Sequence, residues 1–161
     1  MTEAVIIDAV RTPGGKRNGQ FKDVHPVTMA ATVLKALEER NGLDPAMVDD
    51  VIMGCVMQVG EQSLNIGRNA VLAAGWPEEV PSTTVDRQCG SSQQSMHFAA
   101  QGVIAGAYDV VVAAGVEVMT RTPMGASIVQ GMGFPFPQEQ AVPYAVTGLP
   151  PQGIGAVWIA G

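Results

Sequence analysis

The segment TTVDRQCGSSQQS, residues 83–95, joins a short β-branched run to a stretch rich in small residues through a tight turn. The run at 82–86 predicts a strand, and the stretch after the turn predicts a helix that closes at Gly106. Cys89 therefore lies in the turn between a predicted strand and a predicted helix.

The rest of the first 116 residues repeats the same alternation of strand and helix patterns. Nearly continuous apolar runs at 4–10, 51–57 and 108–116 predict buried strands, and helical patterns cover about 28–40 and 64–74. Strands that alternate with helices imply right-handed crossovers and a mainly parallel mixed sheet with helices on both faces. The sequence predicts an α/β fold.

The chain changes in character after about residue 120. Residues 122–152 hold six of the eleven prolines and a single charged residue, Glu139, which is too apolar for a disordered tail. We expect an α/β domain over 1–120 and the start of a second, incomplete domain over 121–161. A helix-like pattern begins at residue 153 and stops at the end, so the chain looks cut short.

Composition excludes several classes of function. The chain of 161 residues is 47% hydrophobic and 15% charged, with a net charge of −6 and a pI near 4.7, so we expect no nucleic-acid binding. Its two cysteines cannot build a secreted disulfide framework. No signal peptide is recognisable, and no apolar run reaches the ~20 residues that span a bilayer. We expect a cytoplasmic protein that does not bind membranes.

Cys89 is the candidate nucleophile. Unpaired N–H groups and the macrodipole at a helix N-terminus favour negative charge, and hence the thiolate form of a cysteine placed there. Gly90, Ser91 and Ser92 leave space for a reacting carbonyl, and the N–H of Cys89 is placed to donate to an oxyanion. From geometry alone, an inert small core residue remains the alternative.

The other candidate side chains favour structural roles. His97 follows Cys89 by eight residues, about 12 Å along a helix, which is too far for a direct base. His25 precedes a proline and indicates a loop. Cys55 lies in an apolar run and indicates a core thiol. The two cysteines and two histidines do not have zinc-ligand spacing, so we expect no metal.

The segment around Cys89 resembles the signature of the acyl-accepting cysteine of thiolases, although Ser92 stands where that family usually has glycine. Other stretches resemble the family in the same order along the chain. They are VRTP (10–13), GCV (54–56) with Gln58, Gly60, Gln62, Asn65 and Arg68, AGVE (114–117) with Met119, PMG (123–125) and PQGIGA (151–156). Val118 and Val157 depart from the usual pattern.

The resemblance implies the N-terminal half of the thiolase fold and Claisen-type acyl transfer between coenzyme A thioesters. Cys89 would carry the acyl group, coenzyme A would be a substrate, and no permanently bound cofactor is implied. Thiolases also use a histidine, a second cysteine and an asparagine from motifs resembling GHP, CxGGG and NEAF, and none of these occurs here. One strand of the family's N-terminal half follows its loop domain and is also missing.

The resemblance further implies a homo-oligomer, with the strand before Cys89 near the subunit contact. We expect the chain to be inactive alone as an acetyl-CoA acyltransferase. The alternative is a non-catalytic thiolase-like remnant or oligomerisation partner.

Overall fold

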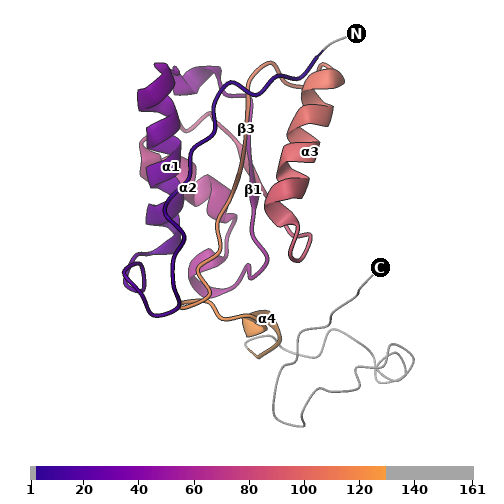
Figure 1. Cartoon of the computed structure of the whole chain (residues 1–161). Helices are drawn as coiled ribbons and strands as arrows, with labels where there is room; N and C mark the ends of the chain where they lie inside the picture. Colours follow the sequence, from indigo (N-terminus) through magenta and orange to yellow (C-terminus); the bar gives the residue numbers. More distant parts are fainter. Residues whose placement is uncertain (1–2, 130–161) are drawn as a thin grey trace, which may run out of the picture.

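A computed structural model describes residues 3–129 of the chain (Figure 1). The strands are β1 (Asp50–Gly54), β2 (Ser82–Val85) and β3 (Val111–Gly115). The helices are α1 (Pro26–Asn41), α2 (Ile66–Ala74), α3 (Ser91–Ile104) and the short α4 (Ala126–Val129), with 3₁₀ turns η1 (Pro45–Met47) and η2 (Gly60–Gln62). None of the described helices is long and apolar enough to cross a membrane.

The three strands form one parallel sheet in the order β2-β1-β3. Helices α1 and α2 lie on one face of this sheet and α3 lies on the other (Figure 1). The predicted α/β fold with a mainly parallel sheet between helices is confirmed. The carboxyl ends of the strands share one row, in which Gly54 is the register partner of both Val85 and Gly115.

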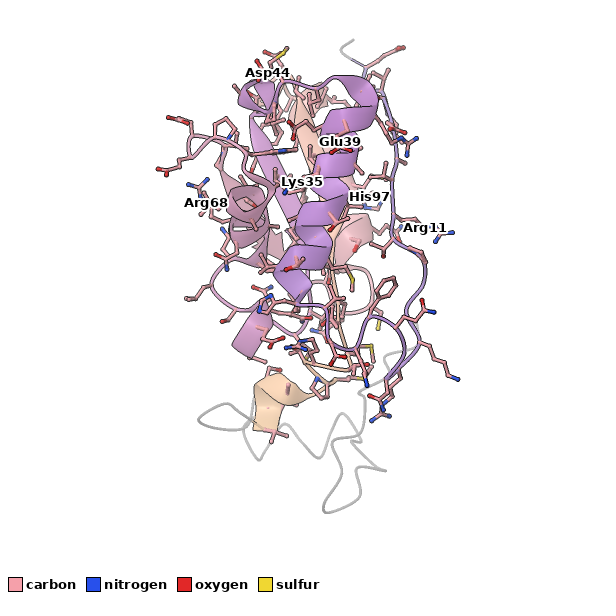
Figure 2. The ribbon with its side chains drawn as sticks, turned by 90° about the vertical axis from the view of Figure 1, so that its left-hand side faces the viewer. Arg11, Lys35, Glu39, Asp44, Arg68 and His97 are labelled. Atoms are coloured by element: carbon pink, nitrogen blue, oxygen red, sulfur yellow. The ribbon has the colours of Figure 1, made fainter. Side chains whose placement is uncertain are left out.

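Helix α1 illustrates how local sequence sets the elements. His25 caps its N-terminus through Nδ1, which accepts from the N–H of Val27 at 3.2 Å, and Pro26 occupies the first turn, where its missing N–H costs nothing. Gly42 ends the helix with φ of 57°, a left-handed conformation that suits glycine. Lys35 and Glu39 lie on the outer face of α1 in Figure 2.

The core lies between the sheet and the α1–α2 layer. Its largest fully buried side chains include Leu34 from α1, Met53 from β1, and Ile66 and Val71 from α2. Trp76, which follows α2, is buried in the same core, and its indole N–H donates to Glu38 on α1 at 2.8 Å. The core thus fixes β1 at the centre of the sheet, and both neighbouring strands take their positions from β1.

The predicted strand at 4–10 is absent from the sheet. The segment has no regular secondary structure, and Val5, Ile6 and Ile7 are 71%, 74% and 81% exposed. A strand needs a hydrogen-bonding neighbour, whereas an open groove of about 970 Å³ separates this segment from β3 and is bordered by α1 and by Met96 of α3. The prediction of a buried strand at 4–10 was therefore wrong: the segment makes no backbone hydrogen bonds to β3, although β3 is the edge strand of the sheet.

Two other predicted strands are shorter than expected, each for a local reason. The run at 51–57 ends at Gly54, because residues 55–59 turn away from the sheet through hydrogen bonds of Gln58 and Val59 to carbonyls two residues earlier. The run at 108–116 begins only at Val111, because Asp49 accepts from the backbone N–H groups of Asp109 and Val110. Of the predicted second domain at 121–161, only residues 121–129 lie within the described part.

Candidate active site

The turn that carries Cys89 is braced by the side chains at its two ends. Oδ1 of Asp86 accepts from the N–H of Gln88 at 2.8 Å. Oγ of Ser91 accepts from the N–H of Arg87 at 3.1 Å and donates to the carbonyl of Gln88 at 2.9 Å. Gln88 itself has φ of 39°, in the left-handed region that costs a residue with a side chain about 1 kcal/mol or more. These bonds hold the turn in a defined conformation in spite of that cost.

Cys89 follows the strained residue and is exposed to solvent. It lies one position before Gly90, the N-cap of α3, which offers no side-chain cap to the first helical N–H groups. The first N–H groups of a helix have no partner within it, so they remain available to an anion or a polarised carbonyl. The predicted strand–turn–helix setting of Cys89 is present in the structure.

Cys55 has the opposite surroundings. It is 1% exposed at the end of β1, and its Sγ lies 3.4 Å from Nε2 of Gln62. Burial raises the pKa of the Cys55 thiol to about 12, with further contributions from the negative charges of Glu117 and Asp86. Cys55 is therefore a neutral thiol at physiological pH, in agreement with its interpretation as a core residue.

A polar cluster next to Cys55 was not singled out by sequence reasoning. Gln62 is 0% exposed, and its amide donates to the carbonyl of Met57 at 2.9 Å and to Glu117 at 2.7 Å, while its oxygen accepts from the N–H of Val118 at 2.8 Å. Glu117 also accepts from the N–H of Val56 at 2.8 Å. Gln62 and Glu117 are 55 residues apart, so no local pattern could have paired them.

The remaining candidates do not join Cys89 in a shared cluster of hydrogen bonds. His25 is an exposed helix cap, and His97 is an exposed residue of α3. Among the described residues there is no group of three histidine, cysteine or acidic side chains that could hold a metal ion. Arg68 instead holds the segment that precedes β2, because its guanidinium donates to the carbonyls of Glu78 and Val80.

Comparison with known proteins defines the class. The family model described as "Thiolase, N-terminal domain" matches residues 4–148, so the chain belongs to the thiolase family through that domain. It is 52% identical over 136 residues to the "Steroid 3-ketoacyl-CoA thiolase FadA6" of Mycobacterium tuberculosis, which covers 84% of this chain and 33% of that protein.

Two further matches agree with this assignment. The chain is 45% identical to a "3-ketoacyl-CoA thiolase" of Pseudoalteromonas translucida, over 77% of this chain and 32% of that one. The crystal structure of the Bacillus anthracis acetyl-CoA acetyltransferase superimposes with a TM-score of 0.71 at 42% identity, over 74% of this chain and 30% of that one. The chain thus spans about one third of the relatives that it matches.

Proposed function

We propose that this protein is an acyl-CoA C-acyltransferase that acts on 3-ketoacyl-CoA or acetyl-CoA through an acyl-cysteine at Cys89. The observation that supports the proposal is the placement of Cys89, which is exposed in a hydrogen-bonded turn. It lies one residue before Gly90, the N-cap of α3, which has no side chain to cap the helix. The substrate class is that of the two relatives described above, which are 3-ketoacyl-CoA thiolases.

The proposed half-reaction with acetyl-CoA exchanges one thioester for another. The Cys89 thiolate attacks the thioester carbonyl, a bond forms between Sγ and the carbonyl carbon, and the bond from that carbon to the coenzyme A sulfur breaks. Coenzyme A leaves with the electron pair and takes up a proton, so no oxidant or metal is needed. The N–H of Cys89 would donate to the negative oxygen of the tetrahedral intermediate.

The complete cycle needs groups that these 161 residues do not contain. No motif resembling GHP, CxGGG or NEAF is present, so we propose that this chain alone completes at most the acylation step. Loss of a general base or a general acid typically costs 10²–10⁴-fold each in rate. The same proposal has four further parts. Residues 121–161 begin a loop domain, and the protein is a homo-oligomer. It is located in the cytoplasm, and coenzyme A is a substrate and not a resident cofactor.

Intact-mass spectrometry tests the acylation step. The purified chain is incubated with acetyl-CoA or acetoacetyl-CoA, and the matched control is Cys89→Ser, which keeps the size of the side chain but provides a much weaker nucleophile. We expect one acetyl group per wild-type chain and none on the variant. Peptide mapping should place the group on Cys89 and leave Cys55 unmodified.

Absence of the mass gain in the folded wild-type chain would contradict the proposal for this chain. The non-catalytic thiolase-like partner would then be the better description. Steady thiolysis of acetoacetyl-CoA by the chain alone, abolished by Cys89→Ser, would instead contradict the expected limitation to acylation.

A further inference from the structure

The first turn of α3 lies directly against two strand residues that have no side chain. Gly54 at the end of β1 and Gly115 at the end of β3 are register partners, and the N–H of Val116 donates to the carbonyl of Gly54 at 2.9 Å. Val85, the last residue of β2, pairs with Gly54 from the other side. The row Val85–Gly54–Gly115 therefore crosses the sheet immediately before the turn that carries Cys89.

The fit between this row and α3 leaves no room for a methyl group. A Cβ built on Gly54 lies 2.5 Å from the carbonyl carbon of Ser91 and 2.7 Å from Cα of Ser92, and real Cβ atoms essentially never approach other atoms within 3.0 Å. A Cβ built on Gly115 instead meets the side chain of Ser92, whose Cβ lies 2.7 Å away. A Cβ on Gly54 would meet helix backbone, whereas a Cβ on Gly115 would meet chiefly the Ser92 side chain, with the Gly54 carbonyl oxygen at 3.3 Å.

Gly54 and Gly115 together form a notch under the first turn of α3. The polar cluster of Gln62 and Glu117 fixes the segments that follow these two glycines. The two segments that leave Gly54 and Gly115 are joined by the bonds from Val56 N–H to Glu117 and from Val118 N–H to Gln62. Cys55 N–H also donates to the carbonyl of Val85 at 3.0 Å, which ties the end of β2 to the segment that follows Gly54. The strand ends are therefore fixed relative to one another, and the notch has a fixed depth.

We propose that Gly54 and Gly115 are positioning residues that set the depth of the α3 first turn on the sheet and thereby the position of Cys89 for the proposed acyl transfer. Ser91 and Ser92, which contact the two glycines, follow Cys89 within three residues, and Ser91 also belongs to its hydrogen-bonded turn. A Cβ at Gly54 must push this backbone outward by roughly 1 Å, and a shift of about that size can cost about 10²-fold in rate. The catalytic half of this inference rests on the proposed function.

The experiment reads the position of Cys89 separately from its chemistry. In the full chain, exposed Cys89 is alkylated with 3-bromo-1,1,1-trifluoroacetone, while buried Cys55 is not, and the ¹⁹F resonance of the label reports the environment of the turn. We expect Gly54→Ala and Gly115→Ala to move this resonance by more than its line width. In unlabelled protein, both variants should slow acetyl transfer from acetyl-CoA about 10²-fold.

Two matched variants make the test specific. Gly102→Ala places a Cβ against the Tyr108 ring, 2.5 Å from its Cε2, at the opposite end of α3. It therefore disturbs the same helix far from Cys89 and should leave the resonance in place. Ser92→Gly removes the two nearest atoms that a Cβ on Gly115 meets and leaves the Gly54 carbonyl oxygen at 3.3 Å, but it does not remove the backbone that a Cβ on Gly54 meets. Ser92→Gly is combined with each glycine variant, and each double variant is compared with Ser92→Gly alone. The combination should restore the resonance and the rate of Gly115→Ala, but not those of Gly54→Ala.

The outcomes separate the two proposals. If Gly54→Ala and Gly115→Ala fold but keep the wild-type resonance, or if Gly102→Ala moves it equally, the positioning role is wrong. If either glycine variant does not fold, the double variant Gly115→Ala/Ser92→Gly provides the test. It should fold and give the ¹⁹F resonance of Ser92→Gly, and failure to do so also overturns the proposal. If the fluorine pattern is as expected but wild type accepts no acetyl group, the notch stands and the proposed function fails.

Discussion

The side-chain amide of Gln62 donates a 2.7 Å hydrogen bond to Oε1 of Glu117 and so joins the segments that follow β1 and β3. The same two side chains accept from the N–H groups of Val118 and Val56, one on each segment. Every polar atom of the buried Gln62 amide therefore has a partner. This pair links the segments beyond the carboxyl ends of β1 and β3, at the end of the sheet where Cys89 lies. Substituting Glu117 therefore tests how the strand ends are held.

Glu117→Gln should destabilise the fold, although it changes only one atom. The glutamate accepts at both oxygens, so either orientation of the new amide puts an NH₂ group against the N–H of Val56 or the amide of Gln62. Turning Gln62 over moves the conflict to Val118 N–H. We expect a loss of about 1–3 kcal/mol in the free energy of unfolding, measured in urea. Glu79→Gln, at an exposed position, should change it by less than about 0.5 kcal/mol. Equal effects would contradict this account.

The two cysteines should differ sharply in reactivity. Cys89 is exposed, whereas Cys55 is 1% exposed and its raised pKa of about 12 keeps it neutral. Because the thiolate is the reactive form, iodoacetamide should label one thiol in the folded chain and two in denaturant. Counted by mass spectrometry, folded Cys89→Ser should take up no label and folded Cys55→Ala should take up one. Rapid labelling of Cys55 in the folded chain would show that β1 does not bury it.

Burial of Cys55 should make stability fall at alkaline pH. The unfolded thiol loses its proton near 9.0, while the folded one keeps it to about 12, so the stabilisation is complete below pH 9 and decreases as pH rises toward 12. The slope should approach about 1.4 kcal/mol per pH unit within that window. Tyr108 acts in the same direction, because its hydrogen bond to Asp50 raises its pKa. Urea unfolding between pH 8 and pH 10.5 should show a shallower slope for Cys55→Ala, and Tyr108→Phe separates the second contribution.

Asp49 should contribute at acidic pH with the opposite sign. The N–H groups of Val110 and Asp109 donate to its carboxylate and lower its pKa below the ordinary 3.8. Its stabilisation is therefore present above that value and is lost as pH falls through the lower folded pKa. Asp49→Asn should have a lower melting temperature than wild type at pH 7, and the difference between the two should shrink as pH falls below 3.8. Asp109→Asn, which removes a neighbouring exposed carboxylate, is the control and should lower the melting temperature at pH 7 less than Asp49→Asn does.

The exposed apolar residues at the N-terminus should promote self-association. Val5, Ile6 and Ile7 lie beside the open groove, and exposed apolar surface of this kind favours contacts between chains. Sedimentation velocity should show larger species as concentration rises, and Ile6→Lys with Ile7→Lys should shift the distribution toward monomer. Ile104→Lys on α3, where the native side chain is 56% exposed, should have a smaller effect. Association that is insensitive to the first pair would place the contact elsewhere.

Local pattern was sufficient where each element depends on its own neighbours. The helical patterns at about 28–40 and 64–74 correspond to α1 and α2, and the glycines at positions 42 and 75 end these helices in left-handed conformations. Parallel pairing followed from the alternation of strands and helices, because neighbouring parallel strands require a crossover. The position of Cys89 between β2 and α3 followed from the same reasoning.

Local pattern failed where the answer depended on a partner distant in sequence. The run at 4–10 has the composition of a strand, yet pairing depends on an adjacent edge, and the groove keeps it away from β3. Gln62 appeared in the sequence only as part of a family motif, and nothing local indicated that its amide would be fully buried against Glu117. Long-range contacts of this kind exist only after the layers have packed.

The sequence alone determined the α/β class, the thiolase family resemblance and the place of Cys89 at a strand-to-helix turn, because periodicity and motifs are local properties of the chain. Only the tertiary structure decided that Gly54 and Gly115 form one notch under α3, that Cys55 is kept neutral, and that residues 4–10 lie outside the sheet. Each of these depends on distances between residues far apart in sequence, which packing sets and no local pattern encodes.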